Sequence, residues 1–276
     1  IFIQNHFSRS SIGFDESYVY WGGPDGYSPD RVLKVPGHCA VDSLAADLDD
    51  DGWAELLIAN NSENSVHLDP GHYIHHFGPD GFEPEKTRTI KTDLGWGVIA
   101  ADFNHDGYLE IVTSANHWSM LRIYYGKDDF QTYDDIPIND MGSPRWICAV
   151  DVNKDGWLDI ICPLINSGRT LILWGGPDGF SIDRCQQLAV RHGANAQAAD
   201  LTHNGWPDLI IGGHTETPKN GRLPDCLPHH SFVYIYWNGP EGISEDRKCV
   251  LRGDAADSFA VADFNNDGWL DIFVGS

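Results

Sequence analysis

The chain has 276 residues and a formal net charge of −23 at pH 7, with 41 Asp and Glu against 18 Lys and Arg. Its length suits one large all-β domain or two smaller domains. The acidic balance argues against binding nucleic acid or an anionic membrane through a basic face, and no apolar run reaches the length of a membrane span. The sequence begins at Ile1 without a signal peptide, so we expect a mature, trimmed or partial chain.

Two landmarks alternate along the chain. The first is an acidic stretch of nine residues, D-x-[D/N]-x-D-G-[W/Y]-x-[D/E], which begins at Asp47, Asp102, Asp151, Asp200 and Asp263 and is degenerate at Asp200. The second is an aromatic–Gly turn close to Gly-Pro-Asp-Gly, found at 21–26, 77–81, 125–129, 174–179 and 237–242. Pro presets the backbone of such a turn, so each copy predicts a tight connection between strands.

Short apolar segments surround the two landmarks. A small-residue segment such as 198–199 precedes the acidic stretch, and a Val/Ile/Leu-rich segment such as 208–211 follows it. A third segment ends in the aromatic turn, as at 171–174, and a fourth follows that turn, as at 184–189. Four short strands that repeat about every 50 residues predict an all-β chain folded as a β-propeller of four-stranded blades.

The acidic stretch has the composition of a calcium loop. Positions 1, 3, 5 and 9 carry oxygen ligands and Gly at position 6 permits a sharp turn, which suits Ca²⁺ with its six to eight oxygens. An EF-hand would need Glu at position 12 and flanking helices, whereas position 12 is Ile, Thr, Cys or Val here and the flanks, such as 56–58, read as strands. The sequence therefore predicts up to five Ca²⁺ sites between strands, and the alternative is a set of acidic turns without metal.

We expect side chains at positions 1, 3, 5 and 9 and the carbonyl at position 7 to bind each ion. The predicted ligands are Asp47, Asp49, Asp51, Trp53, Glu55, Asp102, Asn104, Asp106, Tyr108, Glu110, Asp151, Asn153, Asp155, Trp157, Asp159, Asp200, Thr202, Asn204, Trp206, Asp208, Asp263, Asn265, Asp267, Trp269 and Asp271. The loop at Asp200 has only two carboxylates, so we expect the weakest site there. The aromatic side chains at position 7 are predicted to pack as core between blades.

The copies at 101–107 and 262–268 resemble the FG-GAP/VCBS repeat of integrin α-subunit propellers and of many secreted bacterial proteins. The resemblance covers essentially the whole chain, and it implies Ca²⁺ in the loops, an extracellular or cell-surface location and usually seven blades. Residues 1–5 and 272–276 both align with the second strand of a blade. We therefore expect 1–276 to be a single propeller domain of about five repeats, cut mid-repeat from a six- or seven-bladed ring. The alternatives are a five-bladed ring and a spare strand that pairs with another copy.

Cys148 and Cys162 lie symmetrically about the third loop. We expect them to face each other across a hairpin, as two buried thiols or as a disulfide.

Antiparallel strands place the acidic loops and the aromatic turns at one end of each sheet and the other connections at the opposite end. Aromatic, Arg and His residues gather in these other connections, and the candidate ligand-binding residues are His38, Trp96, His117, Trp118, Arg145, Trp146, Arg169 and His192. Three functions fit: recognition of a glycan or protein, a polysaccharide lyase using His38 or His192 with Arg145, and a structural module that self-associates. We expect recognition without catalysis, because no nucleophile elbow, phosphate loop or zinc signature is present.

Overall fold

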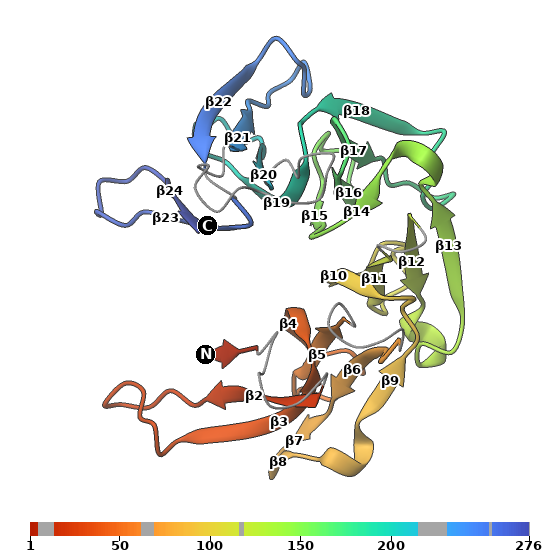
Figure 1. Cartoon of the computed structure of the whole chain (residues 1–276), viewed down its shortest axis with the longest axis vertical. Helices are drawn as coiled ribbons and strands as arrows, with labels where there is room; N and C mark the ends of the chain where they lie inside the picture. Colours follow the sequence, from red (N-terminus) through yellow and green to blue (C-terminus); the bar gives the residue numbers. More distant parts are fainter. Residues whose placement is uncertain (5–13, 62–68, 116–118, 215–230, 254–255, 276) are drawn as a thin grey trace, which may run out of the picture. The chain divides into compact units, whose positions relative to one another are not determined.

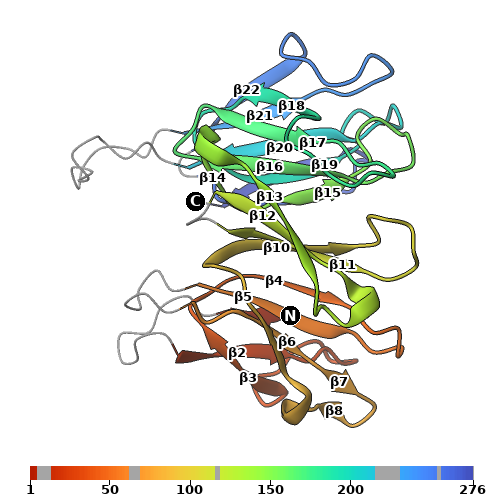
Figure 2. The ribbon, with the colours of Figure 1, turned by 90° about the vertical axis from the view of Figure 1, so that its right-hand side faces the viewer.

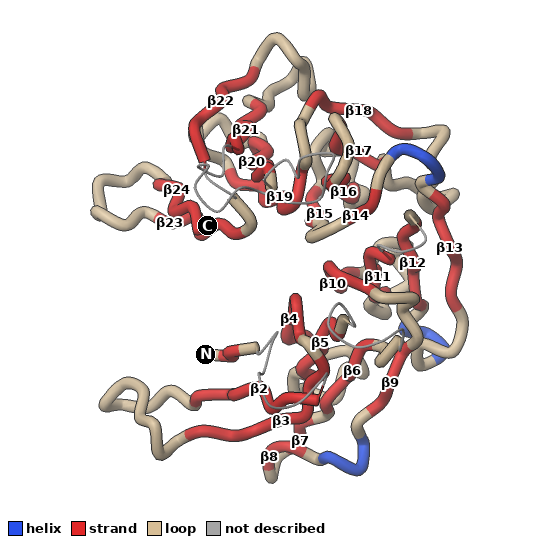
Figure 3. Tube along the Cα trace, viewed as in Figure 1, coloured by secondary structure: helices blue, strands red, loops and turns tan. Residues whose placement is uncertain are grey.

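The computed structural model describes residues 1–4, 14–61, 69–115, 119–214, 231–253 and 256–275. This part of the chain is almost entirely antiparallel β-structure, with three short 3₁₀ helices at Pro84–Lys86, Gly126–Asp128 and Asn139–Met141 (Figure 3). None of its helices is long and apolar enough to cross a membrane. Its contacts divide it into two compact units, which we describe separately.

The first unit comprises Ile1–Asp102, Gly107–Trp118 and Arg122–Asp135. Its sheets run in the order β1-β2-β3, β4-β5-β6-β9 and β10-β11-β12-β13, with the ribbon β7-β8 beside the second (Figure 1). The strands are β1 (Phe2–Ile3), β2 (Phe14–Tyr20), β3 (Val32–His38), β4 (Ala40–Ala46), β5 (Glu55–Asn60), β6 (His72–His75), β7 (Phe77–Gly78), β8 (Gly81–Phe82), β9 (Arg88–Ile90), β10 (Gly95–Ala101), β11 (Glu110–Ala115), β12 (Met120–Tyr124) and β13 (Tyr133–Pro137).

The second unit comprises Phe103–Asp106, Ser119–Leu121 and Ile136–Ser276. Its sheets are β15-β16-β17-β18 with β14 also paired to β16, then β19-β20-β21-β22, and finally β23-β24. The strands are β14 (Ser143–Pro144), β15 (Cys148–Val150), β16 (Asp159–Ile165), β17 (Arg169–Leu173), β18 (Cys185–Ala189), β19 (Gly193–Ala199), β20 (Asp208–Gly213), β21 (Ser231–Tyr236), β22 (Lys248–Gly253), β23 (Ser258–Ala262) and β24 (Asp271–Gly275).

The second strand of each full sheet is buried on both faces. Every residue of β5, β11, β16 and β20 is buried, which explains why these segments read as continuous Val/Ile/Leu runs. In β20, Leu209 and Ile211 join a core with residues of the preceding sheet, while Ile210 between them packs with Phe259 of the following strand pair. Because side chains alternate along a strand, β20 supplies two cores, one on each face of its sheet.

The predicted unit of four sequential antiparallel strands is confirmed by sheets such as β10-β11-β12-β13 and β19-β20-β21-β22. The acidic stretches join first to second strands and the aromatic turns join third to fourth strands, so both lie at the same end of a sheet. Figure 2 shows the strands side-on, with the loop after β10 extending beyond its sheet. The number of blades and the single-domain organisation of 1–276 stay predictions.

The predicted pairing of Cys148 with Cys162 is wrong by one residue. Cys148 lies opposite Ile161 and Cys162 lies opposite Leu171, and neither thiol forms a disulfide. The hairpin register pairs Val150, the residue before the loop, with Asp159 at position 9. A shift of one residue turns a side chain to the other face of a sheet, so the two thiols point in opposite directions.

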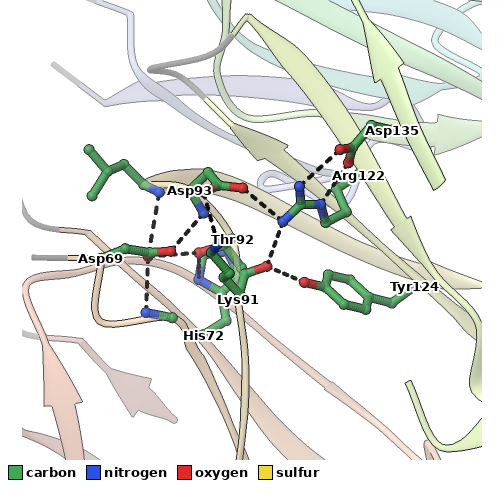
Figure 4. A network of polar contacts seen from close by, with 10 residues as sticks. Asp69, His72, Lys91, Thr92, Asp93, Arg122, Tyr124 and Asp135 are labelled. Carbon is green, nitrogen blue, oxygen red and sulfur yellow. Dashed lines mark hydrogen bonds and ion pairs between the residues drawn. The ribbon is translucent and has the colours of Figure 1, made fainter. Parts of the chain in front are cut away.

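A buried guanidinium fixes the connection between two sheets of the first unit (Figure 4). Arg122 of β12 holds both carboxylate oxygens of Asp135 on β13, at 2.6 and 2.9 Å. It also reaches the β9–β10 connection, where it donates to the carbonyl of Lys91 at 3.2 Å and pairs with the carboxylate of Asp93 at 2.8 Å. The crossover from one sheet to the next is thus anchored by a charge-assisted network.

Candidate functional site

All five acidic loops share one backbone conformation. The residue at position 4 is left-handed in every copy, with φ between 55° and 61° for Asp50, His105, Lys154, His203 and Asn266. The glycine at position 6 follows with φ between 84° and 93°, a region that only glycine enters without strain. The degenerate loop at Asp200 keeps this geometry, so its deviation lies in ligand chemistry and not in shape.

The carboxylate at position 1 organises each loop from inside. In the loop at Asp151 its oxygens accept the amides of Asp155 at 3.2 Å and Gly156 at 3.0 Å. The loops at Asp47, Asp200 and Asp263 repeat both bonds with distances of 2.8–3.1 Å, and Asp102 accepts the amide of Gly107 at 3.1 Å. These bonds hold the position-1 carboxylate inside the loop, where it would be preorganised to bind a cation.

The carboxylate at position 9 is buried in the loops at Asp47, Asp151 and Asp200. Glu55, Asp159 and Asp208 are fully buried, and each accepts the amide of position 2 at 2.8–3.1 Å. Burial raises the pKa of Asp159 to about 6 and also raises the pKa of Glu55 and Asp208. A bound cation would offset this cost, because an opposite charge favours the ionised carboxylate. Carboxylate and amide oxygens on a preformed loop thus fit a hard divalent cation.

Three of the five aromatic residues at position 7 are exposed and not core, which corrects the sequence interpretation for them, while Trp157 and Trp206 are half-buried. Trp53, Tyr108 and Trp269 are 46%, 50% and 56% exposed. In the second unit the side chain at position 4 of one loop instead lies on the aromatic ring of the next. The rings of His105 and Trp157 stack with centroids 4.2 Å apart, His203 stacks on Trp269 at 4.8 Å, and the Lys154 ammonium lies 4.9 Å from the Trp206 ring.

Sequence reasoning missed two features of this end of the sheets. An arginine five residues after the turn glycine donates to that glycine's carbonyl in three copies, Arg31 to Gly26, Arg184 to Gly179 and Arg247 to Gly242. The repeated spacing Gly-x-Ser-x-x-Arg was the available signal. The second feature is His76, which lies against the first acidic loop with its Nδ1 2.9 Å from Oε1 of Glu55.

The candidate ligand residues of the first unit are largely enclosed. His38 and Trp96 are only 3% and 8% exposed, and burial lowers the pKa of His38. His117 and Trp118 lie outside the described residues. A ligand would therefore meet little of the His38 and Trp96 side chains.

In the second unit, candidate ligand residues come together at the ends of strands opposite the acidic loops. Trp146 forms a backbone bridge to Asn195. The side-chain amide of Asn195 donates to the backbone carbonyl of Asp257 at 2.9 Å. The Asp257 carboxylate lies 3.0 Å from Nδ1 of His214, and the amide of His214 donates to the carbonyl of His192 at 2.8 Å. Burial and the neighbouring charges of Arg191 and His214 lower the pKa of His192.

Arg145 precedes Trp146 directly, and both side chains are half-buried, whereas Arg169 is exposed at the start of β17. We call the set Arg145, Trp146, His192, Asn195, His214 and Asp257 the ligand face. It combines one aromatic ring with charged groups and hydrogen-bonding groups, which is the composition of a site that orients a polar ligand.

Comparisons with known proteins agree with this architecture. The chain is 28% identical over 196 residues to phosphatidylinositol-glycan-specific phospholipase D of Bos taurus, which covers 67% of this chain and 19% of that protein. It is 32% identical over 95 residues to integrin alpha-6 of Gallus gallus, covering 32% of this chain and 8% of the integrin. The chain thus spans less than a fifth of the length of these relatives.

Two solved structures share the fold at low identity. The Vibrio cholerae biofilm matrix protein Bap1 matches with a TM-score of 0.52 and 13% identity, covering 95% of this chain and 41% of that one. A lectin of Agrocybe aegerita that recognises non-reducing terminal N-acetylglucosamine matches with a TM-score of 0.50 and 17% identity, covering 93% and 68%.

The FG-GAP-like repeat matches residues 47–113 and 200–274, which together make up just over half of the chain. Each matched region starts at the first Asp of an acidic loop and ends within the second strand of the next sheet, one repeat on, at Thr113 in β11 and at Val274 in β24. With its four-stranded antiparallel sheets, the chain has the β-propeller fold and belongs to the FG-GAP-like repeat family.

Proposed function

We propose that this protein is an extracellular recognition or adhesion module whose ligand, a glycan or a protein, binds the ligand face of the second unit. The observation that carries the proposal is the convergence of Trp146, Arg145 and the His192–His214–Asp257 group from separate connections. An aromatic plane suits a sugar ring or an apolar side chain, and a guanidinium adds directed hydrogen bonds. The likeness to integrins and to a lectin supports a recognition role.

The acidic loops serve stability in this proposal. Ca²⁺ would bind the loops at Asp102, Asp151, Asp200 and Asp263, where the predicted side-chain donors are all oxygens. Each ion would relieve the repulsion between neighbouring carboxylates and would bind only the folded chain. The loop at Asp47 differs in its donor set and is treated separately below.

The decisive experiment combines binding with a matched control. The wild-type chain is screened on a glycan array in Ca²⁺, and the best glycan is titrated by calorimetry. The double variant Arg145→Ala/Trp146→Ala should lose binding while keeping its folded circular dichroism spectrum and its Ca²⁺ stoichiometry. Tyr27→Ala removes an aromatic side chain that is 57% exposed at an aromatic turn, and it should bind like wild type.

Three results would redirect the proposal. Normal binding by the double variant together with lost binding by Tyr27→Ala would place the ligand at the turns. No glycan signal, with capture of a protein ligand that the double variant loses, would make the ligand a protein. An unsaturated product from a uronic-acid polymer, abolished by His192→Ala, would establish a lyase. Because His38 is buried, that alternative rests on His192 and Arg145.

A further inference from the structure

The first acidic loop differs from the others in the residue that covers it. Strand register pairs His75 with Leu56 and Leu173 with Ile160, and both partners stand one residue after position 9 of their loop. His76 therefore takes the place of Trp174 in the third repeat. The repeat aromatic, which has no metal-binding atom at this point, is replaced by an imidazole.

The imidazole of His76 lies among carboxylates. Its Nδ1 is 2.9 Å from Oε1 of Glu55 and 3.6 Å from Oδ2 of Asp49. Its Nε2 is 3.6 Å from Oδ2 of Asp51 and 3.4 Å from Oε2 of Glu83. His76 is only 7% exposed, and one ligand atom each from Asp49, Glu55 and His76 lie within 4.8 Å of one another.

The buried carboxylate of Glu55 supplies an independent observation. Oε2 accepts the amide of Leu48 at 2.8 Å, whereas Oε1 is buried and has no hydrogen-bond partner among the described residues. In the third and fourth loops, the shorter Asp159 and Asp208 place the corresponding oxygen on a backbone amide, at 2.9 and 2.7 Å. The longer Glu side chain instead brings its oxygen to the imidazole of His76.

The separation of these atoms matches two ligands of one ion. Oε1 of Glu55 and Nδ1 of His76 are 2.9 Å apart without the alignment of a hydrogen bond. Metal–ligand bonds of about 2.0–2.2 Å place neighbouring ligand atoms roughly 3.0–3.6 Å apart in octahedral or tetrahedral shells. The distances from Nδ1 to Glu55 and Asp49 lie close to this range.

We propose that the first loop is a mixed nitrogen–oxygen site for a borderline divalent cation of the Zn²⁺ class, bound by Nδ1 of His76, Asp49 and Glu55. Imidazole favours such ions, while Ca²⁺ prefers a shell made only of oxygens. Nε2 then carries the proton and faces Asp51 and Glu83. A carboxylate in that place orients a metal-binding histidine, so Glu83 is a positioning residue.

The alternative is that His76 itself is the cation. A protonated imidazole would neutralise part of the loop's charge, as the Lys86 ammonium does for Glu83 at 2.6 Å, and no ion would then be needed. The two possibilities differ in what happens when His76 is replaced by a neutral, non-basic residue. Removing a ligand abolishes Zn²⁺ binding, whereas removing an internal cation opens the loop to Ca²⁺.

The test is a calorimetric titration of the 276-residue chain with Zn²⁺ in saturating Ca²⁺, which fills the all-oxygen loops. We expect one Zn²⁺ per chain, with binding abolished in His76→Asn and affinity lowered about 10–100-fold in Glu83→Gln, which removes only the orienting carboxylate. His105→Asn is the matched control, because His105 stands in the second loop and stacks on Trp157. Co²⁺ in place of Zn²⁺ should give a visible absorption band that His76→Asn abolishes.

If His76→Asn does not fold, a measurement on the wild-type chain can still test the proposal. With ¹⁵N-labelled histidine, one equivalent of Zn²⁺ should shift the Nδ1 resonance of a single imidazole. The proposal is overturned if Zn²⁺ fails to bind beside Ca²⁺, if His76→Asn binds Zn²⁺ like wild type, or if His76→Asn gains a Ca²⁺ that wild type lacks. The site uses no residue of the ligand face, so such a failure would leave the proposed recognition function standing.

Discussion

Removing the Arg122 guanidinium should destabilise the first unit. Arg122→Met keeps most of the apolar stem but removes the guanidinium from Asp135 and Asp93, leaving Asp93 only the Lys91 ammonium at 3.9 Å, and it removes one donor from the Lys91 carbonyl. Breaking a fully buried ion pair costs about 3–5 kcal/mol. Because the Asp135 side chain is 37% exposed, water compensates part of that loss, and we expect about 2–3 kcal/mol. For a chain of this size, that corresponds to a melting temperature lowered by roughly 5–10 °C.

Thermal unfolding in Ca²⁺-containing buffer, followed by calorimetry and circular dichroism, measures this shift. Arg169→Met is the matched control, since Arg169 is exposed and a surface change of this kind usually alters stability by less than about 0.5 kcal/mol. A double variant with Asp135→Asn should destabilise by less than the sum of the single changes, because the two residues share their interaction. If Arg122→Met melts no lower than the control, the crossover is not held by this network.

Three further predictions concern pH and metal. Burial lowers the pKa of His72 to about 3, so the unfolded chain binds more protons below pH 6.5 and stability falls as pH drops from there. Wild type should lose about 2 kcal/mol between pH 7 and pH 5 relative to His72→Gln, measured by urea denaturation; equal losses would show that His72 is not the group. During chelator titration, the loop at Asp200 should release its ion first; its emptying last would mean that carboxylate count does not set affinity. Excess chelator at low ionic strength should lower the melting temperature, and an unchanged value would count against Ca²⁺ in the loops.

The repeated parts of the fold were predictable from the sequence. The acidic loops, the aromatic turns and the buried second strands recur because every sheet makes the same backbone demands, such as positive φ at position 6. Strands such as β20 show no alternation of apolar and polar residues, because both of their faces are buried. They could still be predicted, since such a strand reads as one short apolar run. Because five copies share the pattern, a strand or loop that is ambiguous in one copy can be assigned from the others.

The exact strand register and the exposure of individual side chains were not predictable. The symmetry argument for Cys148 and Cys162 assumed a register one residue away from the observed pairing of Val150 with Asp159, and nothing in the sequence marks that difference. The exposure of Trp53 and Trp269 depends on what neighbouring loops place beside them, which is tertiary information. The aromatic at 77 was aligned with the repeat aromatics because it precedes a glycine, although strand register gives that place to His76.

The residues to which we assign ligand and metal binding are ones that break the repeat. Loop positions 1, 6 and 9 vary little between copies because they build the same turn. The residue types at these positions therefore reflect the needs of the fold. Trp146 and Arg145 stand five and six residues before Asp151, whereas Asn195 and Ala194 occupy the same places before Asp200 in β19. His76 likewise replaces the aromatic that the same point of the third repeat supplies. In a fold whose stability comes from repetition, ligand and metal selectivity can change through such single departures without disturbing the strands that carry them.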